Sequence, residues 1–270
     1  MAIFGPSGIA GLTARAVLAW IRRDPRAAAL ERTNFRGRTV TLAGGPALAA
    51  GATVGAALGA GSPRRAAAAI TAGAVSGAVG FYDDLAGNRP EQRAAKGFAG
   101  HLGALREGHV TSGLVKIAGV GAAALVASAL LGGRKRDVLL GAGVIAGTAN
   151  LVNLLDLRPG RALKAGTIIG TPLSFGERGG MAAGALGAGA ALLPDDLGEE
   201  IMLGDAGANA LGALLGLALA ARTGTGGRAL ALTVLAGLTA ASEKVSFTKV
   251  IQDTPWLREL DALGRRPPQA

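Results

Sequence analysis

The chain contains no cysteine, so disulfide bonds and thiol chemistry are excluded. It has only two histidines, which makes a zinc site improbable on ligand supply alone. Charged residues make up 17% of its 270 residues, whereas soluble domains carry about 25%. Aromatic residues make up 3%, and half of the residues are hydrophobic. The composition therefore favours a protein with extensive apolar surface.

The few charged residues are bunched along the chain. Eight stretches hold no ionisable side chain apart from Tyr82: 39–63, 66–82, 117–133, 138–155, 165–176, 179–194, 206–221 and 229–242. This pattern is typical of a membrane protein with several spanning helices. The alternative is a soluble helical bundle, but each helix of such a bundle needs a polar face, and 138–155 has no charged face.

We therefore predict an all-α, polytopic transmembrane bundle with about nine spans, in which Gly and Ala permit close packing. The predicted spans are 2–21, 43–61, 66–82, 114–132, 138–156, 163–176, 180–194, 203–221 and 229–242. The first is marginal because Arg15 lies inside it. Several are shorter than the roughly 17–25 residues of a spanning helix, so their charged ends would have to lie at headgroup depth.

The connections differ strongly in positive charge. Alternation of the spans places four connections on one side, together with the tail 243–270: 22–42, 83–113, 157–162 and 195–202. With Lys164 at the start of the next span included, that side holds 18 Lys and Arg residues and the opposite side eight, which predicts that the richer side is cytosolic. The N-terminus is then outside, and residues 1–242 form the membrane domain. We attribute the net charge of +10 to this asymmetry and expect no nucleic-acid partner. No cleavable signal peptide is expected, because no basic segment precedes the first apolar run.

Acidic residues stand at the cytosolic ends of three predicted spans. Asp83 and Asp84 end the third span, Asp156 ends the fifth, and Asp205 begins the eighth. For a single acid, a position at the membrane interface would be explanation enough, but acids at membrane depth are costly and usually functional. Several of them on one surface repel one another and favour a bound cation. Carboxylate oxygens suit Mg²⁺, with Mn²⁺ as the alternative.

Polar side chains accompany these acids. Asn150, Asn153 and Asp156 are spaced i, i+3 and i+6, which places them on one face of a helix. The segment 204–209, Gly-Asp-Ala-Gly-Ala-Asn, would leave backbone N–H groups open to an anion at a helix start. Lys116, in the first turn of the fourth span, could neutralise a phosphate. Together these features predict a metal–diphosphate site at the inner membrane surface.

Three motifs resemble those of the polyprenyl-phosphate N-acetylhexosamine-1-phosphate transferases, the superfamily of MraY, WecA and TagO. The family's G-F-x-D-D is matched by 80–84, and its N-x-x-N-x-x-D by 150–156. Its G-D-x-G-S is matched by 204–208, with Ala208 in place of Ser. The segment 33–38, Thr-Asn-Phe-Arg-Gly-Arg, resembles the family's first cytosolic loop. The resemblance covers most of the chain in order, spacing and predicted membrane side.

The resemblance implies an Mg²⁺-dependent enzyme of cell-envelope glycan synthesis, multi-pass in the bacterial cytoplasmic membrane. It would transfer a sugar-1-phosphate from a UDP-sugar to polyprenyl phosphate and release UMP. Asp205 would bind the metal, with Asp84 as a second ligand, and the catalytic set would be Asp83, Asp84 and Lys116. The side chains implied or expected to bind substrate are Asn150, Asn153, Asp156, Arg158, Arg161 and Asn209. The partners are the lipid bilayer, the two substrates and a second copy of the chain as a homodimer.

The chain also departs from the family. Where the family continues with a further acid, it has Arg158 and Arg161, which either bind a diphosphate or act as basic anchors. The family's His-rich cytosolic loop is replaced by 243–253. The loop after Asp84 is longer than expected, and it contains Lys96 and His101. These departures support a second hypothesis, a non-catalytic relative that binds polyprenyl phosphate and regulates envelope synthesis. A cation transporter would instead carry acids in mid-span. A CDP-alcohol phosphatidyltransferase would gather its acids in one stretch.

Overall fold

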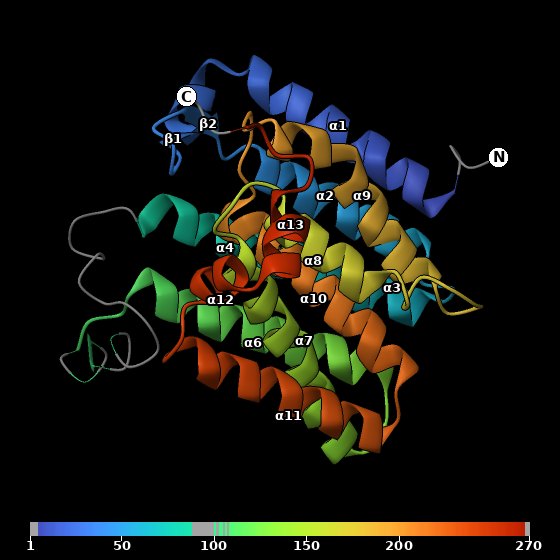
Figure 1. Cartoon of the computed structure of the whole chain (residues 1–270). Coiled ribbons are helices and arrows are strands. Elements are labelled where there is room, and N and C mark those ends of the chain that lie inside the picture. The colour runs from blue at the N-terminus through green and yellow to red at the C-terminus, as the bar shows by residue number, and fades with distance from the viewer. Residues whose placement is uncertain (1–4, 88–99, 101–102, 105, 107, 268–270) are drawn as a thin grey trace.

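The computed structural model describes residues 5–87, 100, 103–104, 106 and 108–267 (Figure 1). Nearly all of the regular structure is helical, so the all-α prediction is confirmed. The longer helices are α1 (Pro6–Arg23), α2 (Gly44–Leu58), α6 (Ser112–Leu131), α7 (Lys135–Leu155), α9 (Gly180–Leu197), α10 (Gly204–Arg222) and α11 (Thr225–Ser242). Shorter elements are η2 (Pro25–Leu30), α3 (Pro63–Ile70), the π-helical η3 (Thr71–Val75), α4 (Ser76–Ala86), α8 (Arg161–Gly170), α12 (Phe247–Asp253) and α13 (Pro255–Ala262). Within the described ranges, the strands β1 (Glu31–Thr33) and β2 (Thr39–Thr41) form an antiparallel hairpin.

In the described part of the chain, three helices are long and apolar enough to cross a membrane, namely α6, α7 and α10. A fourth crossing would need α11 and α12 together, although a bend of 90° separates them. The helix α2 is apolar but shorter. The helix α8 has 10 residues, which is about 15 Å at 1.5 Å per residue, half of a bilayer core. The structure thus contains membrane-capable helices, while the count of nine spans stays a prediction.

The helix α10 forms the centre of the bundle. It packs against α2, α4 and α7, and most of its residues are buried. Small residues let the neighbouring helices approach α10 closely, since a Cβ atom on Gly212 would lie 2.6 Å from the backbone oxygen of Thr148 in α7. The remaining long helices cover α10, with α1 packed on α2 and α9, and α11 packed on α7 (Figure 1).

The helices α2 and α9 touch through their backbones. A Cβ atom on Gly184 would lie 2.2 Å from the backbone oxygen of Gly55, and one on Gly59 would lie 2.1 Å from that of Gly180. Close approach through glycine is typical of helix packing in membranes, where van der Waals contact replaces the hydrophobic effect as the main attraction between helices.

Connections that are far apart in sequence gather at two opposite ends of the bundle. At one end, β2 meets the loop after α9 through a bridge between Thr41 and Ile201, and Arg161 at the start of α8 pairs with Asp261 of α13. At the other end, Thr225 hydrogen-bonds to Asp137, and Arg222 donates to the backbone oxygen of Phe175. We call the first of these the hairpin end. It gathers the described parts of the connections predicted to be cytosolic.

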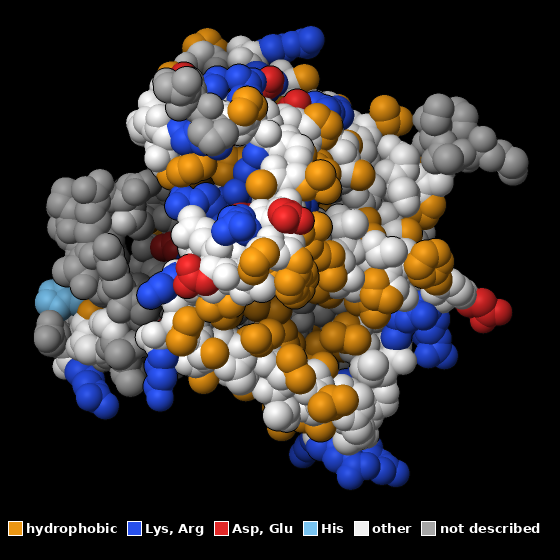
Figure 2. Space-filling view, in the orientation of Figure 1, with side chains coloured by type: hydrophobic (Ala, Val, Ile, Leu, Met, Phe, Trp, Pro, Cys, Tyr) orange, Lys and Arg blue, Asp and Glu red, His pale blue; other side chains and the backbone are white. Residues whose placement is uncertain are grey.

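The surface carries many large apolar side chains. Figure 2 shows hydrophobic side chains over the middle of one face, with Lys and Arg toward its margins. Leu12, Leu139 and Leu230 are between 59% and 68% exposed. Extensive exposed apolar surface of this kind suits contact with lipid.

The backbone contact between α2 and α9 gives a stability test. We expect Gly184→Val to lower the free energy of unfolding by about 3 kcal/mol or more, because the new side chain meets backbone that has no room to move. Thermal unfolding of the detergent-purified protein would measure the loss. Gly121→Val is the matched control, since a Cβ atom on Gly121 meets nothing within 4 Å. Equal melting temperatures for the two variants would contradict the packing described here.

Candidate functional site

The candidate site is built around the first turn of α10. The carboxylate of Asp84, near the end of α4, accepts hydrogen bonds from the backbone N–H groups of Asp205 (2.9 Å) and Ala206 (3.0 Å). The carboxylate of Asp156, which directly follows α7, lies near the backbone N–H of Gly204. The first N–H groups of a helix have no partner within it, and the helix dipole favours negative charge there. An acid of α4 therefore caps α10, and a second acid lies beside the same helix start.

Glycines allow this close meeting of α4 and α10. A Cβ atom on Gly80 would lie 2.3 Å from the backbone oxygen of Asp205, and one on Gly204 would lie 2.7 Å from Oδ1 of Asp84. Gly204 also has a φ of 56°, in the left-handed region that glycine adopts without strain. The glycines that precede the acids in two of the motifs are thus needed for packing.

The ammonium group of Lys116 lies between two further carboxylates. Its Nζ atom is 2.6 Å from Oδ2 of Asp83, and it also forms an ion pair with Oδ2 of Asp205. The hydroxyl of Ser112, one turn earlier in α6, donates to Asp83. The three ionic side chains are between 13% and 24% exposed. The helices α4, α6 and α10 thus bring together Asp83, Lys116 and Asp205, as predicted from the sequence.

The donor set around Lys116 suits a small hard cation. Among the described residues, no group of three or more acidic or His side chains has the arrangement of a metal cage. Mg²⁺ commonly takes one or two protein carboxylates and completes its shell with phosphate and water, so Asp83 and Asp205 supply a sufficient set. Both oxygens of Asp84 accept backbone hydrogen bonds. The structure therefore places Asp205 and Asp83 together around Lys116 and Asp84 at the start of α10, while Asp205 and Asp84 as metal ligands stay a prediction.

A cavity of about 380 Å³ opens beside Lys116, between α6, α7 and α11, and we call it the amide cavity. Its polar lining includes Asn150, Asn153 and Asn209, all predicted from the sequence. The amide of Asn150 donates to the hydroxyl of Thr239 (3.1 Å), and that of Asn209 to the backbone oxygen of Asp205 (2.8 Å). Its apolar lining includes Ile117, Val120 and Leu154. The amide cavity therefore combines an apolar wall with a charged and amide-rich end.

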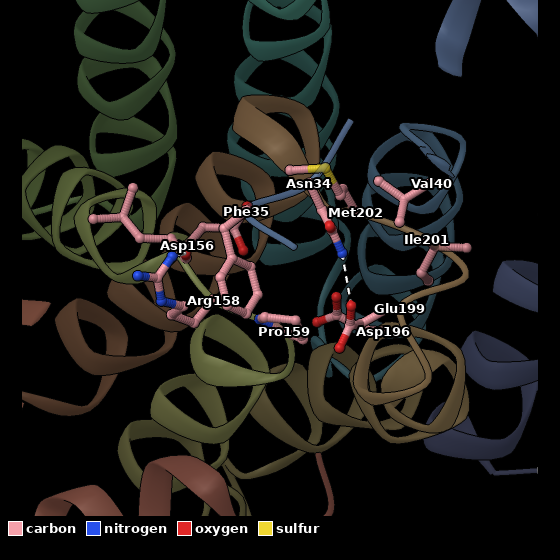
Figure 3. Close-up of a pocket in the computed structure, with 11 residues that line it drawn as sticks. Asn34, Phe35, Val40, Asp156, Arg158, Pro159, Asp196, Glu199, Ile201 and Met202 are labelled. Atoms are coloured by element: carbon pink, nitrogen blue, oxygen red, sulfur yellow. Dashed lines mark hydrogen bonds between the residues drawn. The ribbon is translucent and has the colours of Figure 1, made fainter. Parts of the chain in front are cut away.

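A second cavity of about 170 Å³ lies at the hairpin end, and we call it the hairpin cavity (Figure 3). Three connections line it: the hairpin loop, the segment 156–159, and the loop after α9. The guanidinium of Arg158 stacks 4.1 Å from the centre of the Phe35 ring, and Asn34 donates to Glu199 (2.7 Å). Sequence reasoning singled out Asp156 and Arg158 here but gave no role to Phe35, Asp196 or Glu199. In the sequence, Phe35 is marked only by the resemblance of 33–38 to the family's first loop, and Asp196 and Glu199 only by the acidic segment 195–200.

The three polar residues of 150–156 separate between the two cavities. Asn150 and Asn153 line the amide cavity, whereas Asp156 lines the hairpin cavity. The helix α7 ends at Leu155, and Asp156 has a non-helical ψ of 52°. Because the chain leaves the helix there, Asp156 does not continue the face predicted from helical spacing.

Arg161 lines neither of these two cavities. Its side chain is buried, and its Nε and second guanidinium nitrogen donate to the two carboxylate oxygens of Asp261 at 2.8 and 2.9 Å. Its remaining nitrogen donates to the hydroxyl of Thr248 (2.8 Å). Burial raises the pKa of Asp261, but hydrogen bonds from Arg161 help to hold this pKa below its ordinary value. Arg161 thus binds the C-terminal tail. Lys96 and His101 lie outside the described residues.

Comparison with known proteins leaves the chain without an assigned family, since no family model matches it and no curated protein is significantly similar. The chemistry of the site is therefore argued from the side chains themselves.

The ion triad gives a test that does not depend on activity. We expect Lys116→Met to lower the free energy of unfolding by on the order of 3 kcal/mol when divalent cations are chelated, because Asp83 and Asp205 then face each other without a counter-charge. Millimolar Mg²⁺ should restore much of this loss. Thermal melts in EDTA and in Mg²⁺ would measure both effects, with Lys135→Met as a control at an exposed lysine. If Mg²⁺ does not change the melting temperature of the Lys116→Met variant, the result would count against the cation site.

Proposed function

We propose that this chain is a phosphoglycosyl transferase of the bacterial cytoplasmic membrane. It transfers a sugar-1-phosphate, most simply from a UDP-N-acetylhexosamine, to polyprenyl phosphate and releases UMP for envelope glycan synthesis. The observation that carries the proposal is the meeting of Asp83, Lys116 and Asp205 from three helices at one end of an apolar bundle, beside an amide-lined cavity. The three matching motifs, and the cytosolic orientation predicted for this end, support it.

The amide cavity suits the lipid acceptor. Its apolar wall, with Ile117, Val120 and Leu154, can contact a prenyl chain, and Lys116 at its charged end can bind the phosphate. A site for a phosphorylated polyprenyl chain needs both an apolar wall and a cation, because the prenyl chain is apolar and its phosphate head is charged.

The hairpin cavity suits the donor nucleotide. The Phe35 ring offers an aromatic face to a base, and Arg158 offers a cation for phosphate. Asp156 lines this cavity and lies near the start of α10, so it links the donor cavity to the ion triad. The two substrates would therefore meet at the first turn of α10.

In the proposed reaction, an oxygen of the polyprenyl phosphate attacks the sugar-bearing phosphorus of the donor. A new P–O bond forms, the anhydride bond to the uridylyl phosphate breaks, and UMP leaves with the bonding electrons. Lys116 would hold the acceptor phosphate, and Asp83 and Asp205 would hold the cation. When bound, Mg²⁺ would neutralise the charge of the diphosphate. Positioning and charge neutralisation account for most catalysis of this type.

One observation favours the alternative, a non-catalytic relative that binds polyprenyl phosphate. Lys116 is already paired with both carboxylates, and Arg161 is committed to Asp261, so fewer cations remain for a diphosphate than the sequence suggested. Binding without turnover needs only the amide cavity.

Release of UMP from a panel of UDP-sugars, by purified protein with undecaprenyl phosphate and Mg²⁺, tests the enzyme proposal. We expect turnover with at least one donor, and a loss of about 100-fold or more for Asp205→Asn, because charge stabilisation is the largest contribution to such reactions. Asp253→Asn, at an exposed acid of α12, should retain parental turnover. If no donor yields UMP while polyprenyl phosphate still binds, the binding alternative replaces the enzyme.

The proposed orientation can be tested through the absence of cysteine, because any inserted thiol is then unique. Phe175 and Leu263 are each 66% exposed, and they lie near opposite ends of the bundle. We expect a membrane-impermeant maleimide to label Phe175→Cys in intact cells and Leu263→Cys only after permeabilisation. The parent chain should remain unlabelled, and the reverse pattern would show that the bundle is inverted.

A further inference from the structure

The end of the described chain is hydrogen-bonded to two walls of the hairpin cavity and lies beside the remaining wall. We call residues 261–267 the C-terminal brace. Arg265 donates to the backbone oxygen of Pro159 in the first wall (2.8 Å). Gly264 lies beside the end of α9, next to the second wall, since a Cβ atom on it would lie 3.1 Å from Cδ1 of Leu197. Arg36 of the hairpin loop, the third wall, donates to the backbone oxygens of Arg266 and Pro267 (both 3.1 Å).

The brace is firmly attached at its first residue. Asp261 pairs with Arg161 and with Arg265, and the Asp261–Arg265 distance is 2.6 Å. Lys164 donates to the backbone oxygens of Leu260 (3.0 Å) and Asp261 (2.7 Å). The side chains of Asp261, Arg161 and Arg265 are each 12% exposed or less. Charge-assisted hydrogen bonds in such a protected position are stronger than exposed ion pairs.

The brace lies outside the cavity. The residues that line the hairpin cavity come from the three walls, and no described residue of the tail is among them. The tail therefore does not plug the cavity. In Figure 1 the tail crosses the hairpin end, and its last described residues lie near β1 and β2.

The hairpin needs support of this kind. Each of its strands has three residues, and a two-stranded hairpin is marginally stable by itself in water. It carries Asn34 and Phe35 into the cavity, so their position depends on what holds the loop in place. Arg36 provides one such attachment through the brace, and it also pairs with Glu199 at 3.0 Å.

We propose that the C-terminal brace is a positioning device for the ligand of the hairpin cavity, with Asp261 and Arg265 as positioning residues. It sets the spacing of the three walls from outside, and thereby the distance between Phe35, Arg158 and Asp156. The identity of the ligand, the uridine diphosphate part of a donor, rests on the proposed function. The mechanical role of the brace does not.

Hydrogen exchange in the whole purified chain tests the mechanical role. Two variants break the brace: Arg265→Met, and truncation after Gly264. We expect the amides of 31–41 to exchange about tenfold faster in both, because the hairpin loses charge-assisted bonds. Arg265 itself contacts Pro159 and Asp261, so a response in the hairpin must travel through the brace. Arg258→Met, at an exposed arginine of α13, and truncation after Pro267 should leave the hairpin unchanged. The melting temperatures should stay close to that of the parent.

Equilibrium binding of UDP in the presence of Mg²⁺ tests the effect on the ligand. We expect the two brace variants to bind UDP about tenfold more weakly than the parent and the two controls, as for loss of charge-assisted positioning bonds. Parental exchange in the hairpin of both brace variants would overturn the proposal, as would tighter UDP binding, which would make the segment a lid. If the truncated chain does not fold, Arg265→Met decides. If the parent chain itself does not bind UDP, the donor assignment fails, and hydrogen exchange still decides the brace.

Discussion

The unpaired backbone N–H groups at the start of α10 are the constraint on which the site depends. Because α10 is the buried centre of the bundle, these groups cannot be left without partners at reasonable cost. Asp84, from a helix far away in sequence, satisfies two of them, and Asp156, which directly follows α7, lies near a third. The start of α10 thus fixes the end of α4 and lies close to the end of α7, and the side chains next to these acids follow.

The same constraint divides the acids by role. Asp84 is held by backbone N–H groups and Asp156 lies near one, whereas Asp83 and Asp205 face the ammonium of Lys116. The two adjacent aspartates therefore differ in their contacts because successive residues of a helix point about 100° apart, one toward α10 and the other toward α6. An ammonium between two carboxylates marks a position at this end where a cation is strongly favoured.

Small residues and the tail have complementary effects. Glycines let α2, α4, α7, α9 and α10 approach through their backbones, so these helices pack closely. The amide cavity lies between helices, and the hairpin cavity lies where short connections meet. The brace from Asp261 to Pro267 joins two of those connections, the hairpin loop and the segment 156–159. A closely packed bundle and a braced end together give a site with defined geometry.

The sequence by itself determined that the chain is all-α, where its apolar helices lie, and which acids, amides and lysine stand at helix ends. These are local properties, since hydropathy, charge and helical spacing are read within one segment. Asp83, Lys116 and Asp205 could be predicted to meet because span alternation places their helix ends on one side. Tertiary structure alone decided that Asp205 and Asp83 share the ammonium group of Lys116. It also decided that Asp156 leaves the helix face of Asn150 and Asn153. It also decided that Arg161 binds the tail and that Phe35 enters a cavity. Each of these features depends on where a helix ends or on contacts between segments more than about 80 residues apart, such as Arg161 with Asp261. Helix ends and distant contacts are not encoded in any single stretch of the chain.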